Sequence, residues 1–206
     1  MNKIILNANH LVINALTAIK NKNYIEAKNL LEKAISIQPE MFEANHNLAI
    51  LNFQLGNLDS SILYFEKSRK IKPKFSQVYF NLGLAYDRKK NIDLAIINFK
   101  KVIKLDPNNS IALYNIGHLY KAKLEPIKAE EYLNKSLDLN PNFIKTYDDL
   151  FSLYDQSNQI EKFSNLLNKA KKILNEKFFV SFYEAVLIYN QKKFKQTIQI
   201  LQNIDL

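Results

Sequence analysis

Apolar and polar residues follow one another along the chain in blocks that predict pairs of helices. Between residues 77 and 105, two segments of about a dozen residues carry apolar side chains at helical spacing, and a short polar turn separates them. We therefore expect helices over Gln77–Lys89 and Asp93–Leu105. Asn91 stands where its side-chain oxygen can accept a hydrogen bond from a free backbone amide of the second helix.

The same block recurs at a fixed period. Pro39, Pro73, Pro107 and Pro141 stand 34 residues apart, each where a second helix has to end because proline cannot continue it. A fixed period of about 20–50 residues is typical of stacked repeats, which bury their apolar faces against their neighbours. We predict one all-α domain over residues 1–206, with six helix-turn-helix repeats at 8–41, 42–75, 76–109, 110–143, 144–177 and 178–206.

The repeat resembles the tetratricopeptide repeat. The third unit carries the family's pattern at positions 4, 7, 8, 11, 20, 24 and 32, namely Tyr79, Leu82, Gly83, Tyr86, Ala95, Phe99 and Pro107. The fourth unit repeats it with Leu113, Ile116, Gly117, Tyr120, Ala129, Leu133 and Pro141. The resemblance extends over nearly the whole chain and implies a right-handed all-α solenoid whose first helices line a concave groove. The resemblance indicates little about activity, because one fold can carry many functions.

The formal net charge of +9 raises the question of a nucleic-acid partner. However, Arg69 and Arg88 are the only arginines among the 29 basic residues, and most lysines lie beside Glu or Asp on predicted helix faces. We interpret the charge as a solvated lysine-rich surface and expect no nucleic-acid partner. No apolar run is long enough to span a membrane, and polar residues interrupt the segment Met1–Lys20, so we expect neither a membrane partner nor a signal peptide. A cytoplasmic location is the expectation.

The sequence offers little for catalysis. The chain has no cysteine, and its three histidines, His10, His46 and His118, lack metal-ligand spacing. Its three glycines do not form a phosphate-binding loop. The adjacent carboxylates Asp148 and Asp149 point about 100° apart on a helix, so they cannot face each other as an acid–base pair. We expect no enzymatic activity, no cofactor and no metal.

Position 6 of the repeat indicates a binding surface. Asn47, Asn81 and Asn115 occupy it in three successive units, a ladder similar to that of the O-linked N-acetylglucosamine transferase superhelix. The resemblance implies that the ladder holds an extended peptide, since a carboxamide offers both a donor and an acceptor to a peptide unit. Asparagine is also common at this position across the family, which leaves a purely structural role open. The aromatic residues expected around the ladder are His46, Phe53, Phe80, Tyr114 and His118. The charged residues expected there are Arg88, Lys121 and Lys145.

These features predict a non-catalytic protein- or peptide-binding scaffold. The alternative is the non-catalytic N-terminal region of a larger glycosyl- or sulfotransferase. It is favoured by the last helix, where Ile198, Ile200, Leu201 and Ile204 remain apolar although repeat arrays usually end in a polar capping helix. The same apolar stripe predicts a homodimer through the C-terminal repeat.

We predict that the positive charge does not mediate nucleic-acid binding. Filter binding to single- and double-stranded nucleic acid should show no saturable complex at about 150 mM salt, where contacts to phosphates are strongly weakened. Sub-micromolar binding under these conditions would contradict the prediction.

Overall fold

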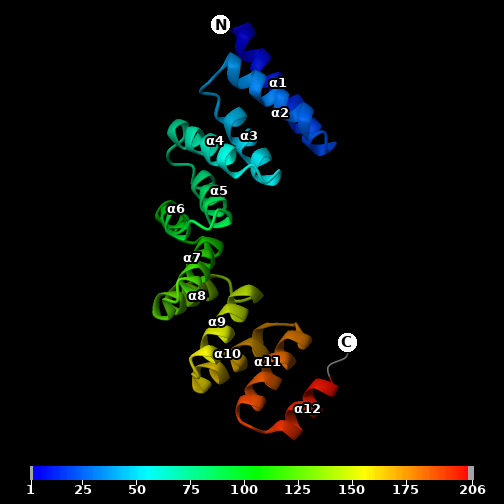
Figure 1. The fold of residues 1–206 in the computed structure, drawn as a ribbon, viewed down its shortest axis with the longest axis vertical. Helices are drawn as coiled ribbons and strands as arrows, with labels where there is room; N and C mark the ends of the chain where they lie inside the picture. The colour runs from blue at the N-terminus through cyan, green and yellow to red at the C-terminus, as the bar shows by residue number, and fades with distance from the viewer. Residues whose placement is uncertain (1, 204–206) are drawn as a thin grey trace. The chain divides into compact units, whose positions relative to one another are not determined.

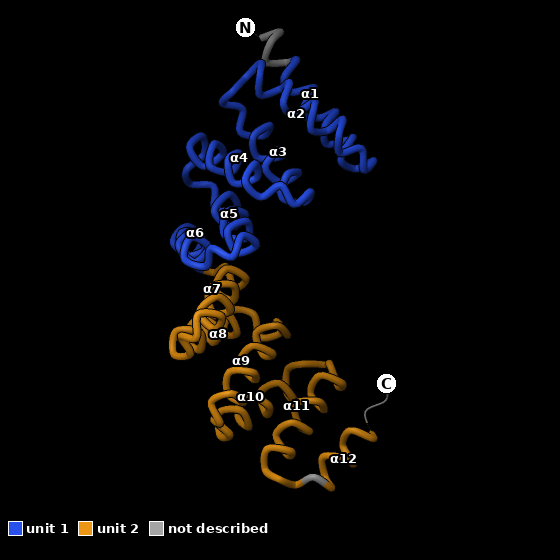
Figure 2. Tube along the Cα trace, in the orientation of Figure 1, with its two compact units in different colours: residues 1–107 blue, residues 108–206 orange. Residues whose placement is uncertain are grey.

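The computed structural model describes the backbone of residues 2–203 and the side chains of residues 7–193 and 195–203. Within this part of the chain all regular secondary structure is helical, in twelve α-helices without a strand (Figure 1). The predicted all-α fold of about six helical repeats is confirmed. The chain divides into two compact units, Met1–Pro107 and Asn108–Leu206 (Figure 2).

Unit 1 consists of three helix pairs. Its helices are α1 (Asn2–Lys20), α2 (Tyr24–Ile37), α3 (Phe42–Gln54), α4 (Leu58–Ile71), α5 (Ser76–Arg88) and α6 (Ile92–Leu105). Each first helix packs against the second helix of its own pair, and each second helix packs against the first helix of the next pair. In addition, α3 contacts α5 directly, so the first helices of neighbouring pairs form one face of the unit.

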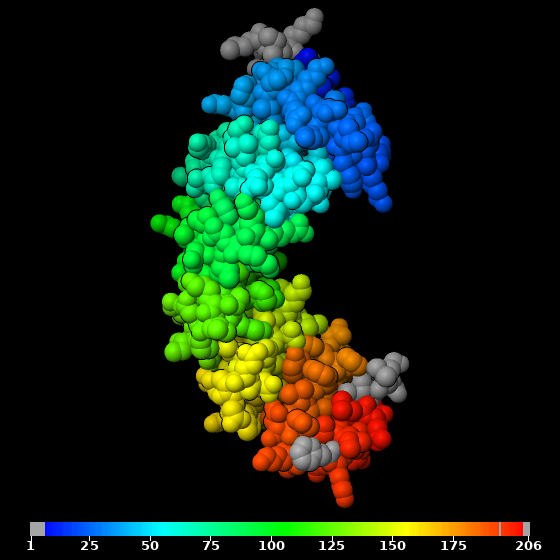
Figure 3. All heavy atoms as spheres, viewed as in Figure 1, coloured from blue at the N-terminus to red at the C-terminus, as the bar shows by residue number. Residues whose placement is uncertain are grey.

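Unit 2 repeats this plan. Its helices are α7 (Ser110–Ala122), α8 (Pro126–Leu139), α9 (Ile144–Gln156), α10 (Ile160–Ile173), α11 (Lys177–Asn190) and α12 (Phe194–Gln202). Here α7 contacts α9 as α3 contacts α5 in unit 1. Figure 3 shows the side chains of successive helix pairs in contact along each unit. The core of unit 2 is centred on aromatic residues of α9 and α10, among them Phe151 and Phe163, whose ring centroids are 4.8 Å apart.

The helix boundaries lie where the sequence predicts them, with small shifts. In the third repeat, α5 begins and ends one residue before the predicted range, and α6 begins one residue earlier. The Asn91 side chain accepts a hydrogen bond from the backbone amide of Leu94, as expected for an N-cap. Asp106 caps the C-terminus of α6 with a non-helical backbone, as expected for the residue before Pro107.

The turn inside each helix pair contains one residue with a left-handed backbone. These residues stand 34 apart along the chain: Lys22, Gly56, Lys90, Leu124, Asn158 and Lys192. In the second repeat the amides of Gly56 and Asn57 donate to the carbonyls of Phe53 and Asn52, the hydrogen bonds of a Schellman motif. The other turns form the same two bonds. The turn is therefore built from backbone hydrogen bonds that repeat in every pair.

Two glycines allow the helices of a pair to approach closely. A Cβ atom placed on Gly83 would lie 2.7 Å from the ring of Phe99, and one on Gly117 would lie 2.7 Å from the Leu133 side chain. Both partners are fully buried on the second helix of the same pair. The missing side chain on one helix is thus the space that the large side chain of the other helix occupies.

Apolar side chains remain exposed on the last helix. Ile198 and Leu201 are about half exposed on α12. Ile204, which was expected to continue this stripe, lies outside the described residues. The homodimer through the C-terminal repeat remains a prediction.

We predict that Gly117→Ala destabilises the protein by about 1–3 kcal/mol, because the added methyl group overpacks a filled interface. The Leu133 backbone nitrogen would lie 3.0 Å from the added Cβ atom, which limits the relaxation that a side chain alone could provide. Chemical denaturation of the variant and of Asn115→Ala, on the same helix, measures the effect. The control should stay within about 0.5 kcal/mol of the parent, and a Gly117→Ala variant as stable as the parent would contradict the close approach.

Candidate functional site

The contact between α3 and α5 creates a pocket on the first-helix face of unit 1. The pocket has a volume of about 340 Å³ and is lined by Ile50, Phe53, Phe65, Gln77, Asn81 and Leu84. The aliphatic and aromatic side chains come from α3, α4 and α5, and the two carboxamides come from α5. The pocket is therefore mostly apolar, with hydrogen-bonding groups on one helix, which is typical of small binding sites.

Two of the three predicted asparagines lie on this face of unit 1. Both are partly exposed. The Asn47 amide nitrogen donates to the Glu43 carbonyl oxygen of its own helix at 2.8 Å, and the Asn81 amide oxygen accepts from the Gln77 side chain at 3.1 Å. Asn47 therefore retains its side-chain oxygen as an acceptor, and Asn81 retains its side-chain nitrogen as a donor.

Arg88 lies beside the pocket, on the last turn of α5. Its guanidinium carbon is 4.3 Å from the centroid of the Phe53 ring, and its Nη1 donates to the Phe53 carbonyl oxygen at 3.1 Å. Both contacts are made to uncharged groups of the neighbouring first helix. Because Phe53 also lines the pocket, Arg88 brings a positive charge to the pocket's edge.

His46 and Phe80 pack into aromatic clusters. The His46 ring lies 5.2 Å from Phe42, 5.6 Å from Phe65 and 5.9 Å from Phe75, measured between centroids. Its Nδ1 is buried and accepts no hydrogen bond from the described residues. Phe80 lies edge-on to Phe99 at 5.5 Å. Both side chains are partly buried. A ligand can therefore contact only the exposed edge of each ring, because the rest packs against other aromatic side chains.

Burial lowers the pKa of His46. The nearby Glu43 carboxylate raises it in part, and the Lys72 ammonium lowers it further. Lys72 itself forms an ion pair with Glu43 at 2.9 Å, so the carboxylate that could stabilise a histidinium ion is already engaged. The neutral imidazole is therefore the form that fits this aromatic surrounding.

In unit 2 the corresponding space between α7 and α9 is closed by an ion-pair network. Asp149 is only 4% exposed. One of its oxygens lies 2.7 Å from Nδ1 of His118, and the other accepts from Nζ of Lys121 at 2.6 Å. Burial opposes ionisation of Asp149, but the hydrogen bonds from these two residues outweigh it, so the pKa of Asp149 lies below its ordinary value.

The remaining predicted residues of unit 2 surround this network. The Tyr114 ring stacks on His118 at 5.8 Å and meets Phe143 edge-on at 4.9 Å. Burial, followed by the nearby Asp149 carboxylate, raises the pKa of Tyr114, so its phenol stays protonated. Asn115 is partly exposed, and its amide nitrogen donates to the Ile111 carbonyl oxygen at 2.8 Å, as Asn47 does to Glu43.

The two spaces correspond position by position, two repeats apart. His118, Lys121 and Asp149 in unit 2 stand where unit 1 has Ile50, Phe53 and Asn81. The three polar residues of unit 2 bind one another, whereas the three residues of unit 1 line the open pocket. The same helix geometry thus gives a closed polar contact in one unit and an apolar pocket in the other.

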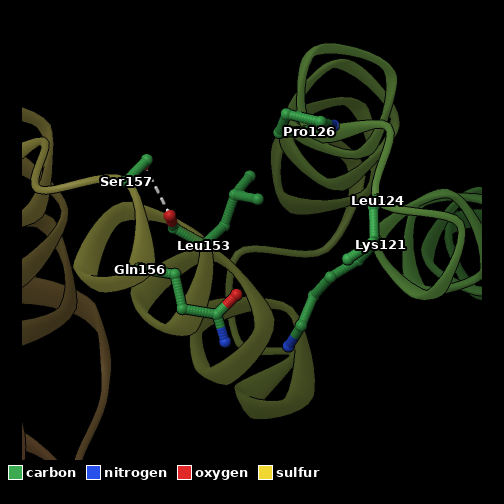
Figure 4. A pocket seen from close by; sticks show the side chains of 6 residues that line it. All are labelled: Lys121, Leu124, Pro126, Leu153, Gln156 and Ser157. Carbon is green, nitrogen blue, oxygen red and sulfur yellow. Dashed lines mark hydrogen bonds between the residues drawn. The ribbon is translucent and has the colours of Figure 1, made fainter.

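Unit 2 has a different pocket, next to the turn between α7 and α8. It measures about 220 Å³ and is lined by Lys121, Leu124, Pro126, Leu153, Gln156 and Ser157 (Figure 4). The Ser157 hydroxyl donates to the Leu153 carbonyl oxygen at 2.6 Å. Figure 4 shows the polar ends of Lys121 and Gln156 on the same side of the pocket. Leu124 is 86% exposed in the left-handed turn beside it.

Four residues that line the pocket of unit 1 were not predicted from the sequence: Ile50, Phe65, Gln77 and Leu84. Ile50 and Leu84 both hold position 9 of their repeats, the position of His118 in the fourth repeat, so the period offered a signal for them. No group of three or more metal-ligating side chains occurs among the residues that the structure describes. None of the helices described is both long enough and apolar enough to cross a membrane.

Family models agree with the repeat pattern. A model of the tetratricopeptide repeat matches residues 76–109 and again residues 110–143, and a second tetratricopeptide repeat model matches residues 18–82. Together these matches cover more than half of the chain. No curated protein matches it.

Solved structures share the fold at low sequence identity. PilF of Pseudomonas aeruginosa has a TM-score of 0.74 and 18% identity, over 97% of this chain and 91% of that one. A tetratricopeptide repeat protein from Parabacteroides merdae has a TM-score of 0.78 and 15% identity, over 97% and 79%. YrrB, described as a tetratricopeptide repeat protein with an unusual peptide-binding site, has a TM-score of 0.65 and 16% identity, over 84% and 89%. At these identities the likeness establishes the fold alone.

We predict that His46 makes the stability of the protein depend on pH. Because its pKa is lower in the folded chain, the stability it contributes is fully present above the unfolded value of about 6.5 and is lost as the pH falls through that value towards the folded pKa. His46→Phe keeps an aromatic ring in the cluster and removes the titrating group. Thermal unfolding at about pH 7.5 and about pH 5 should show a smaller loss of stability for the variant than for the parent. Equal losses would contradict the prediction.

Proposed function

Because the chain belongs to the tetratricopeptide repeat family, we propose that it is a non-catalytic scaffold that binds an extended segment of a partner protein. The observation that carries the proposal is the pocket of unit 1, where apolar side chains and carboxamides meet between α3 and α5. We place the principal binding site there. A cytoplasmic location fits this role and is part of the proposal.

Asn47 and Asn81 support a contact with peptide backbone. One retains an acceptor and the other a donor after their contacts within unit 1. A peptide unit presents the complementary pair, an N–H and a C=O, whatever its side chain is. We propose that the two carboxamides hold the backbone while the pocket takes a side chain, so that one face provides both affinity and selectivity.

The first-helix face of unit 2 is proposed to contribute contacts of its own. Asn115 offers its side-chain oxygen there, and the Tyr114 and His118 rings stack beside it. These groups suit polar and aromatic contacts at the surface, since the space behind them is occupied by Asp149. The peptide-binding site named for YrrB, a protein of similar fold, also supports a binding role for a repeat array of this size.

We predict that replacing Asn47 and Asn81 together by alanine separates binding from stability. Each substitution should change the free energy of unfolding by no more than about 0.5 kcal/mol, since both side chains are partly exposed. Each should weaken peptide binding by about 0.5–1.5 kcal/mol through the loss of a hydrogen bond. Peptides selected from a random displayed library on the parent protein provide the probe for titration calorimetry.

The fully buried Leu82 lies on α5 beside Asn81 and provides the opposite control. Leu82→Ala should lower the free energy of unfolding by about 2–5 kcal/mol through loss of core packing. The proposed function is refuted if the library yields no binder. It is refuted equally if the double alanine variant binds the selected peptides as tightly as the parent does.

A further inference from the structure

The charge of Arg88 is not balanced within unit 1. Among the described residues its guanidinium contacts the ring and the carbonyl oxygen of Phe53, both of them uncharged. By contrast, two nearby lysines are neutralised by carboxylates: Lys89 forms an ion pair with Asp59, and Lys72 forms one with Glu43. Arg88 is thus a cation at the edge of the apolar pocket. Its guanidinium has five N–H donors, and within the described part of the chain only one of them is used, in the hydrogen bond from Nη1 to Phe53.

Unit 2 shows how a carboxylate fits into the same kind of space. There Asp149 lies between the first helices and binds Lys121 at 2.6 Å and His118 at 2.7 Å. The residue at the corresponding position of unit 1 is Asn81, which carries no charge and lines the open pocket. The positions of His118 and Lys121 are taken in unit 1 by Ile50 and Phe53, so unit 1 lacks both the carboxylate and its two partners. Its cation, Arg88, stands at a different position of the repeat, at the edge of a space that no carboxylate among the described residues of unit 1 fills.

We propose that the unit 1 pocket recognises a partner segment in which a large apolar side chain stands close to an acidic one. The apolar side chain occupies the pocket against Ile50, Phe53 and Leu84, and the acidic side chain pairs with Arg88. This inference rests on the proposed function and names the class of peptide that the site takes.

The size of the pocket supports the apolar part of this motif. Its volume of about 340 Å³ exceeds the roughly 150 Å³ of an apolar cavity that holds benzene. An aromatic ring or a branched aliphatic side chain therefore fits with room for part of its backbone. An alanine would leave most of the apolar surface uncovered and gain little from burial.

The charge of Arg88 supports the acidic part. A guanidinium presents parallel donors that match the two oxygens of a carboxylate. Its contact with the Phe53 ring holds the group in place before a ligand arrives, so less side-chain freedom is lost on binding. A lysine or arginine at the same place in the partner would meet a like charge, which disfavours basic segments.

The experiment measures binding of four synthetic peptides to the full chain by fluorescence anisotropy. All four share a capped glycine–serine backbone that carries one guest pair: phenylalanine with glutamate, with glutamine or with lysine, and alanine with glutamate. Three variants are compared with the parent. Arg88→Gln removes the charge, Asn81→Asp places a carboxylate in the pocket lining, and Lys104→Gln on α6 removes one positive charge from an exposed site on a second helix. Circular dichroism melting confirms that each variant is folded.

We expect the phenylalanine–glutamate peptide to bind the parent about tenfold more tightly than the phenylalanine–lysine peptide. A difference of this size corresponds to the gain of about one charge-assisted hydrogen bond. The alanine–glutamate peptide should bind more weakly than the phenylalanine–glutamate and phenylalanine–glutamine peptides. Arg88→Gln should abolish the preference for glutamate, and Lys104→Gln should retain it. Asn81→Asp should reverse it, because the new carboxylate lies on the same helix face as Arg88, two turns before it. Raising the salt concentration should narrow the preference in the parent.

The possible failures are distinct. If the glutamate, glutamine and lysine peptides bind the parent equally, or if Arg88→Gln keeps the preference, the acidic motif is wrong while peptide binding in the pocket stands. If alanine–glutamate binds as well as phenylalanine–glutamate, the apolar part is wrong. If none of the peptides binds the parent, the proposed function and this inference are both overturned.

Discussion

The close approach of the two helices in each pair is the constraint on which the rest of the structure depends. Gly83 leaves the space that the Phe99 ring fills, and Gly117 does the same for Leu133. Once the helices of a pair are this close, their outer apolar faces have no partner except the next pair, and the repeats stack. The first helices then meet directly, α3 with α5 and α7 with α9, and the candidate binding surface is made of that contact.

Most of the fold could be predicted from the sequence because its determinants are local and repeated. Proline after the first four of the second helices, asparagine before the first three and glycine at two of the helix crossings each act on their own neighbourhood. Their 34-residue spacing reveals them even where a single repeat is irregular. The fifth repeat shows the limit of this signal, since Phe163 replaces the small residue and the core there is aromatic instead.

The site could be predicted only in part, because it depends on which side chains bind one another across helices. Asn81 and Asp149 both hold position 6 of their repeats, on the first helix of each pair. In the structure Asn81 lines an open pocket, whereas Asp149 is buried against His118 and Lys121. The repeat period gives the position of a side chain. Whether the space around that side chain is open or filled depends on residues of the neighbouring repeat, such as Lys121, which pairs with Asp149. The pattern within a single repeat does not contain this information.

The residue with a left-handed backbone in each turn can be substituted during evolution, because the turn does not depend on its side chain. Each turn is held by the same two backbone hydrogen bonds, whether its left-handed residue is glycine, lysine, asparagine or leucine. Because the side chain takes no part in these bonds, it can be exchanged at a modest and local energetic cost. The turns within the helix pairs can therefore accept different residues without disturbing the register of the repeats, as the six turns of this chain do. Leu124, with its exposed side chain, is an example of what that tolerance permits.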